Sequence, residues 1–108
     1  MTDKRIVLTT AGSEEEAGKI ARQLVERGLA ACVNIVPRIE SIYHWKDNVE
    51  EAVEWLLIVK TTAAGFPAVQ EAILQLHSYE VPECICLNVE DGSEEYLRWI
   101  GDSVSKDP

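Results

Sequence analysis

The stretch that decides the fold runs from residue 29 to residue 62 and reads "LAACVNIVPRIESIYHWKDNVEEAVEWLLIVKTT". Two long runs rich in β-branched and aromatic residues flank a polar break at Lys46-Asp47-Asn48. Asp and Asn tolerate positive φ, so this break predicts a hairpin turn. Pro37 cannot donate a hydrogen bond to a strand ladder, so it predicts a bulge or kink in the first arm.

The arms of this hairpin are unusually long. Residues 31–43, if continuous, would extend roughly 40 Å at about 3.3 Å per residue, whereas most strands stop at about ten residues. A small domain cannot cover such a hairpin, and its far end would present unpaired edges beside Ile42, Tyr43 and Trp45. Exposed edges invite pairing with other chains, and closed homo-oligomers are the usual outcome. We therefore expect a homo-oligomer paired through the hairpin arms; a bent, intramolecular hairpin is the alternative.

The remaining segments complete an alternating order of strands and helices. A strand is expected at 4–10, a helix at 13–28, a second helix at 65–77, a short strand at 84–90 and a third helix at 91–104. Ser13 and Glu16 form a capping box, Gly28 ends the first helix and Pro67 suits the start of the second. The expected apolar faces are Ala17, Ile20, Ala21, Leu24 and Val25; Val69, Ala72, Ile73 and Leu76; and Tyr96, Leu97, Ile100 and Val104.

This order predicts the fold class α+β. It is a ferredoxin-like β-α-β-β-α-β sandwich, with the long hairpin between its second and third strands and an added C-terminal helix. Residues 1–108 contain no repeat, low-complexity tract or Pro/Gly-rich linker, so we expect a single domain.

Composition excludes several classes of function. The net charge is −9, with 19 acidic against 10 basic residues, which disfavours binding to nucleic acid. No apolar run reaches membrane-spanning length and no signal peptide is recognisable, so we expect no membrane association and a cytoplasmic location. Three cysteines are an odd, sparse set, so we expect reduced thiols.

Few residues indicate chemistry on their own. There is no nucleotide-binding loop and no nucleophile elbow, so no enzymatic activity is expected. Cys84 and Cys86 share one face of a strand and, with His77, could hold Zn(II) or Cu(I). Buried cysteines also behave as small hydrophobes, so we interpret the pair as packing residues. Lys60 ends an apolar run and could extend its amine to solvent or bind an anion.

A second polar group lies on the returning arm of the hairpin. Glu50, Glu51 and Glu54 are close in sequence, but alternation on a strand directs Glu51 away from the other two. We interpret this group as a solvated edge.

The stretches "LAACVNIVP", "SIYHW", "LLIVKTT", "LHSYEVPE" and "YLRWI" occur in the same order in one known family. From about Ile6 to Val104 the chain resembles CutA, the divalent-cation tolerance proteins. The resemblance implies a ferredoxin-like homotrimer with hairpin strands paired across subunits, and an architecture similar to the PII signalling proteins. It also implies a protein that binds or responds to divalent metal ions such as copper, with no obligatory cofactor.

The resemblance also implies functional residues. Cys32 and His77 match positions tied to metal binding in some members. The other matching positions, which we assign to a pocket between subunits, are Tyr43, Trp45, Glu54, Lys60, Tyr79, Glu83 and Trp99.

The chain departs from the family pattern at three places. Thr9 stands where some members carry a cysteine, Lys46-Asp47-Asn48 replaces a turn that usually contains glycine, and Cys84 replaces a commoner isoleucine. The alternative function is a PII-like signalling or assembly module that binds a small anionic effector between subunits, with Lys60 as its charge partner. An acyl-phosphate hydrolase is disfavoured, because no arginine-bearing phosphate loop is visible.

Overall fold

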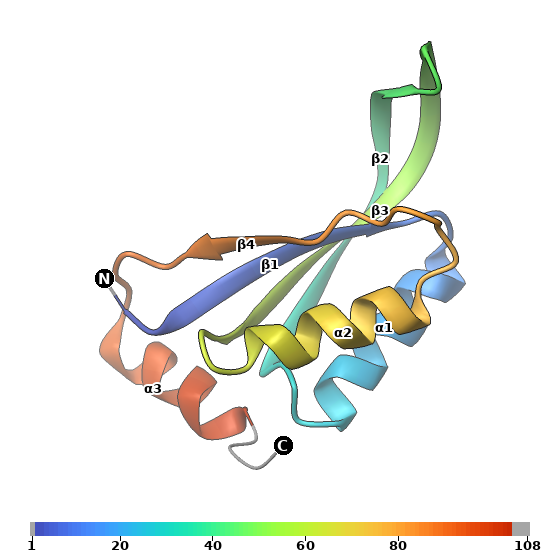
Figure 1. The fold of residues 1–108 in the computed structure, drawn as a ribbon. Helices are drawn as coiled ribbons and strands as arrows, with labels where there is room; N and C mark the ends of the chain where they lie inside the picture. Colours follow the sequence, from blue (N-terminus) through green and yellow to red (C-terminus); the bar gives the residue numbers. More distant parts are fainter. Residues whose placement is uncertain (1, 105–108) are drawn as a thin grey trace.

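The computed structural model describes residues 2–104, which form a four-stranded antiparallel sheet with α1 and α2 on one face (Figure 1). Strand β1 lies inside the sheet, paired with β3 on one side and β4 on the other, in the order β2-β3-β1-β4. This is the ferredoxin-like order, so the predicted α+β class is confirmed. The elements are β1 (Lys4–Ala11), α1 (Glu14–Glu26), β2 (Cys32–Trp45), β3 (Asn48–Thr62), α2 (Phe66–Leu76), β4 (Ile85–Asn88) and α3 (Glu94–Ser103).

Helix α1 begins and ends as its sequence predicts, with one difference in the cap. The Glu16 backbone N–H donates to Ser13 Oγ at 3.1 Å, and Gly28 adopts φ of 71° after the last turn. The carboxylate of Glu16 bonds to Ser78 on another segment, so only half of the predicted capping box is confirmed. Val25 is 42% exposed, so its assignment to the buried stripe was wrong.

The core lies between the sheet and the two helices that cover it. Ala17, Ile20, Ala21 and Leu24 of α1 are buried as predicted, as are Val69, Ala72 and Ile73 of α2. They pack with Val7, Leu57 and Val59 from β1 and β3.

Helix α3 buries a narrower face than its sequence suggested. Ile100 and Val104 are buried, as predicted. Tyr96 is 44% exposed and packs against Trp99 with ring centroids 5.4 Å apart, so it lies outside the buried part of the predicted apolar face.

The hairpin of β2 and β3 contains both predicted irregularities. Lys46 and Asp47 adopt positive φ of 49° and 68°, as the two central residues of a tight hairpin turn require. Val36 pairs with Leu56 and Ile39 with Glu54, so Pro37 and Arg38 together face a single residue. This is a β-bulge, and Arg38 has φ of 56° within it.

Residues 39–54, which we call the arm, rise away from the rest of the sheet (Figure 1). The arm contributes to a longest molecular extent of 44 Å, against 25 and 22 Å in the other directions. Ile42 and Val49 are 68% and 65% exposed on it. The predicted projecting hairpin with apolar side chains is therefore confirmed, whereas the homo-oligomer stays a prediction.

Two buried threonines give a matched test of the core. Thr61 Oγ1 donates to the Leu29 carbonyl at 2.8 Å, whereas Thr9 Oγ1 has no partner among residues 2–104, and both side chains are fully buried. An unsatisfied buried hydroxyl is unfavourable, so Thr9→Val should raise the free energy of unfolding by about 1 kcal/mol. Thr61→Val removes a satisfied bond and should lower it by about 1–3 kcal/mol. Urea denaturation at one protein concentration measures both; changes of the same sign would contradict the assignment.

Candidate functional site

The segment between α2 and β4, residues 77–84, is called the connector here, and it covers an open edge of β1. Strand β4 pairs with β1 only from Arg5 to Leu8, so it leaves the later residues of β1 uncovered. His77 fills part of this gap, because its Nε2 bonds to the Thr10 carbonyl at 2.5 Å. Its Nδ1 accepts from the Tyr79 backbone N–H at 3.1 Å, so Nε2 carries the proton. Both ring nitrogens of His77 are therefore engaged.

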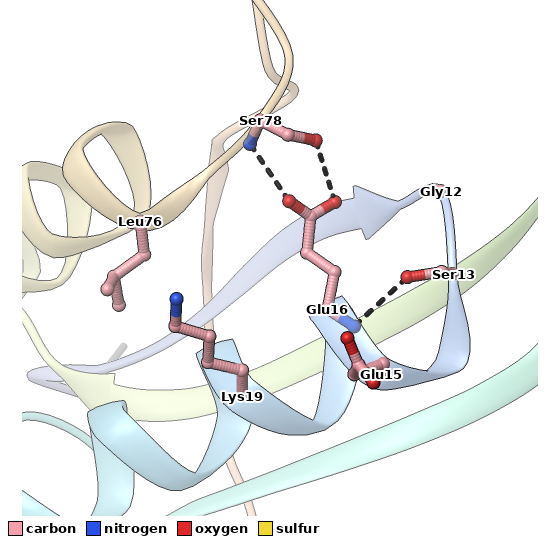
Figure 2. A pocket seen from close by; sticks show the side chains of 7 residues that line it. All are labelled: Gly12, Ser13, Glu15, Glu16, Lys19, Leu76 and Ser78. Atoms are coloured by element: carbon pink, nitrogen blue, oxygen red, sulfur yellow. Dashed lines mark hydrogen bonds between the residues drawn. The ribbon is translucent and has the colours of Figure 1, made fainter.

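Glu16 ties the connector to the start of α1 (Figure 2). Its two carboxylate oxygens accept from Ser78, from the backbone N–H at 2.9 Å and from the hydroxyl at 3.1 Å. Partial burial raises the pKa of Glu16, but the bonds from Ser78 and the nearby His77 outweigh this and leave the pKa lowered. These groups border an open depression of about 460 Å³, lined by Gly12, Ser13, Glu15, Glu16, Lys19, Leu76 and Ser78.

A buried carboxylate lies where the arm leaves the sheet. Glu54 is only 7% exposed, and the Tyr79 hydroxyl donates to its Oε2 at 2.7 Å. The interpretation of Glu54 as part of a solvated edge was therefore wrong, because a connector 25 residues further along the chain packs over it. Gly12 makes room for this contact: a Cβ there would approach the Tyr79 hydroxyl to 2.8 Å.

The electrostatics of this cluster disfavour additional negative charge. Burial, the bond to Glu54 and the charge of Glu54 together raise the pKa of Tyr79, which therefore stays protonated as a donor. Burial, followed by the charge of Glu54, also raises the pKa of Glu83. The structure thus brings three of the predicted pocket residues together, since Glu54 bonds to Tyr79 and its charge acts on both Tyr79 and Glu83.

Glu83 predicts a measurable pH dependence. A carboxyl with a raised folded-state pKa contributes stability below its unfolded value, near 4.5, and loses it as the pH rises through the folded value. Glu83→Gln removes that loss, so the variant should be more stable than the wild type at pH 7 and equal to it below about pH 4.5. Urea midpoints at pH 7 and pH 4 measure the difference.

The matched control for this prediction is Glu80→Gln, at an exposed glutamate of the same connector. It should change stability by less than about 0.5 kcal/mol at either pH. A gain at pH 4 as large as that at pH 7 for Glu83→Gln would show that charge is not its cause.

Lys60 and Cys32 lie together on the sheet face opposite the helices. The two residues are paired in register, and Lys60 Nζ lies 4.0 Å from Cys32 Sγ and bonds to Asn34 Oδ1. No carboxylate among residues 2–104 forms an ion pair with Lys60. This group therefore places the positive charge of Lys60 on the sheet face opposite the helices. It is separate from the connector.

The two residues expected to bind metal do not meet within one chain. Cys32 faces Lys60 on β3, whereas Thr10, the partner of His77, faces Leu56. Four residues along a strand correspond to roughly 13 Å. No group of three or more His, Cys, Asp or Glu side chains in residues 2–104 is placed to hold a metal ion.

The aromatic members of the predicted pocket are also dispersed. Tyr43 and Trp45 lie on the arm, 43% and 42% exposed, and Lys46 Nζ is 5.7 Å from the Trp45 ring. Trp99 is on α3 and 44% exposed. A pocket that uses all seven residues therefore requires another subunit, and it stays a prediction.

Cys84, directly before β4, and Cys86 within it follow the predicted alternation. Cys84 and Cys86 are partly buried and pack against the core, whereas Ile85 and Leu87 are 48% and 43% exposed on the other face. Burial, followed by Cys86 and Glu83, raises the pKa of the Cys84 thiol. All three cysteines are free, as expected.

Sequence reasoning missed three contributors to these groups: the Glu16 carboxylate, Ser78 and Asn34. Glu16 could be recognised in the sequence as a helix-capping residue, but no local pattern indicated its bonds to Ser78.

No helix in residues 2–104 is long and apolar enough to cross a membrane.

These features define a small α+β protein with ferredoxin-like topology, a projecting hairpin arm and a polar connector that closes over the root of that arm. The chain belongs to the CutA1 divalent ion tolerance protein family, whose model matches residues 5–103. "Divalent-cation tolerance protein CutA" of Thermus thermophilus is 49% identical over 101 residues, or 94% of this chain and 98% of that protein. Human "Protein CutA" is 46% identical over 91 residues, 84% of this chain but only 51% of that protein.

Solved structures agree with this assignment. The divalent cation tolerance protein of T. thermophilus superposes with a TM-score of 0.92 at 48% identity, covering 94% of this chain and 99% of that one. A structure from Archaeoglobus fulgidus, described as a periplasmic divalent cation tolerance protein, gives 0.91 at 40% identity and covers 94% and 99% of the two chains. An Arabidopsis thaliana relative, 42% identical over 99 residues (92% of this chain and 54% of that protein), is called chloroplastic. The names of relatives thus point to several compartments.

Proposed function

We propose that this chain acts in divalent-cation tolerance as a cytoplasmic homotrimer that binds or responds to divalent metal ions such as copper. The observation that carries the proposal is membership of the CutA1 family over residues 5–103. The net charge of −9 is compatible with it, since an acidic surface attracts cations.

The arm supports the proposed assembly. It projects from the sheet with Ile42 and Val49 about two-thirds exposed. A single chain leaves these apolar side chains in water, whereas pairing with neighbouring arms would bury them and satisfy the open strand edges. Closed three-fold symmetry then stops further growth.

The proposed metal ligands restrict where an ion can bind. Cys32 offers a partly exposed thiol, but the ammonium group of Lys60 lies beside it, and His77 has both ring nitrogens engaged. The two residues do not fit a shared ion within one chain. A divalent ion bound by both would therefore lie between subunits, and His77 would have to release Thr10 or Tyr79.

Calorimetric titration of the reduced, assembled protein with Zn(II) and Cu(II) tests this proposal. We expect saturable binding tighter than about millimolar, or roughly −4 kcal/mol, that is lost in Cys32→Ser and in His77→Gln. His44→Gln is the control, since His44 lies on the exposed arm, and it should bind as the wild type does. No saturable binding to the wild type would overturn direct metal binding.

A second function is supported by Lys60, which lies on the sheet face opposite the helices and has no carboxylate partner among residues 2–104. In a PII-like module this amine would bind the charge of a small anionic effector between subunits. Thermal-shift measurements with nucleotides and organic acids should show stabilisation that disappears in Lys60→Ala. Shifts that persist unchanged in that variant would exclude this role for Lys60.

A further inference from the structure

Cys84, the last residue of the connector, and Cys86 of β4 form a pair of thiols that neither proposed function uses. Cys84 and Cys86 are free, partly buried and directed toward the helix-covered side of the sheet, because Ile85 and Leu87 occupy the other side. Residues two apart on a strand are separated by about 6.6 Å along the chain. Side-chain rotation that brings the two sulfur atoms closer would let them share one ion, since thiolate–metal bonds are about 2.3 Å long.

Strand β1 carries a buried hydroxyl on the face of the sheet to which these thiols are directed. The pairing of β4 with β1 ends at Ile85 and Leu8, and Cys86 faces Val7; extending that register by one residue would place Cys84 opposite Thr9. Thr9 is fully buried on the same face as Val7, and its Oγ1 has no hydrogen-bond partner among residues 2–104. A buried hydroxyl without a partner calls for an explanation, and here it is a donor on the sheet face to which the two thiols are directed.

The thiol pair is also accessible. In the sheet formed by residues 2–104, β4 is an edge strand, with β1 on one side and no strand on the other. Both thiols retain partial exposure, so an ion can reach them from the sheet edge without opening the core. Their position is separate from Cys32, which lies on the opposite face of the sheet beside Lys60.

We propose that Cys84 and Cys86 form a two-coordinate site for a soft, thiophilic monovalent cation such as Cu(I), with the Thr9 hydroxyl as an outer hydrogen-bond donor. Thiolates select soft ions of this kind. Two thiols and one Cu(I) give a bis-thiolate complex and release two protons, and the copper keeps its oxidation state. The complex carries one negative charge in a partly buried place, and Thr9 can donate to a sulfur that bears it. The site would extend the proposed role in metal tolerance to reduced copper, but it depends on neither Cys32 nor His77.

Anaerobic competition for Cu(I) against the chelator bicinchoninate tests the site in the full, reduced chain. The Cys84→Ser and Cys86→Ser variants should each weaken Cu(I) binding by more than about 100-fold, beyond the roughly 10- to 100-fold typical of losing an outer-shell partner. Ile85→Ser is the matched control, because Ile85 lies between the two cysteines but is 48% exposed on the other face, and it should bind Cu(I) as the wild type does. Far-UV circular dichroism and urea midpoints check that each variant is folded.

Thr9→Val gives a readout that a purely structural role would not produce. The variant should be more stable than the wild type without metal, yet bind Cu(I) about 10- to 100-fold more weakly. If a buried water shared with the unpartnered Trp55 Nε1 satisfies Thr9 instead, Cu(I) affinity will be unchanged, and Thr9 has no part in the site.

Thiol protection needs no variant and covers the case in which a substitution disturbs folding. One equivalent of Cu(I) should protect Cys84 and Cys86, but not Cys32, from alkylation by iodoacetamide. The proposal would be overturned if Cu(I) protected Cys32 alone or no thiol at all. It would also be overturned if Cys84→Ser and Cys86→Ser both left the affinity for Cu(I) unchanged. Failure here leaves the divalent-ion titration of Cys32 and His77 unaffected, so the two proposals can fail separately.

Discussion

Ile42→Lys is expected to convert the proposed trimer into single chains. Ile42 is 68% exposed on an arm that stands away from the body of the protein, and Val49 beside it is 65% exposed. Full burial of such a side chain is worth roughly 1.5–3 kcal/mol, and a symmetric trimer would lose this three times. A lysine would also bring an unpaired charge into the contact. Sedimentation equilibrium at several protein concentrations measures the change in mass.

Leu74→Lys is the matched control for this experiment. Leu74 is 53% exposed, but it lies on the outer side of α2, away from the arm. A lysine there should leave the mass of the assembly unchanged. A wild-type protein that sediments as a single chain at micromolar concentration, or an Ile42→Lys variant that stays fully assembled, would contradict the proposed role of the arm.

The arm also shows what local sequence can predict. The bulge at Pro37-Arg38 follows from a residue that cannot donate to a ladder, and the turn at Lys46-Asp47 follows from side chains that tolerate positive φ. The alternation of Cys84 and Cys86 with Ile85 and Leu87 likewise follows from strand geometry. In each case the cause lies within a few residues of its effect.

The contacts of the candidate site, in contrast, depend on residues that are far apart in the sequence. Its defining bonds join Tyr79 to Glu54, Ser78 to Glu16 and His77 to the Thr10 carbonyl, at sequence separations of 25, 62 and 67 residues. No local pattern records which glutamate a distant tyrosine will reach. The sequence therefore predicts that Glu54 is a solvated strand residue, whereas the structure shows that it is buried.

The family resemblance selected candidate site residues that no local pattern indicated, but it did not show which of them lie close together. It selected Glu54, Tyr79 and Glu83, which the structure does bring together. It also selected Cys32 and Lys60, which share the sheet face opposite the helices, and Trp45 and Trp99, which lie apart from them on the arm and on α3. Residues selected together because of a shared assembly need not meet within a single subunit.

Tyr79→Phe is expected to lower the free energy of unfolding by about 1.5–3 kcal/mol, the usual worth of a hydrogen bond to a charged group. The variant keeps the ring over Gly12 but leaves the Glu54 carboxylate buried without its donor. Tyr96→Phe is the control, because Tyr96 is 44% exposed and its hydroxyl has no hydrogen-bond partner among residues 2–104, and it should change stability by less than about 0.5 kcal/mol. Urea denaturation at one protein concentration compares the two variants.

The loss should depend on Glu54 and not on the tyrosine alone. Glu54→Leu replaces the buried charge with an apolar side chain, so adding Tyr79→Phe to that variant should cost much less than it does in the wild type. The double-mutant cycle then yields a coupling energy between the two positions, expected in the range of about 0.5–3 kcal/mol for groups in direct contact. Equal costs in both backgrounds would mean that Tyr79 stabilises the connector through packing. A positive coupling would identify this bond as the link that holds the connector to the root of the arm, so that a ligand displacing Tyr79 would loosen both.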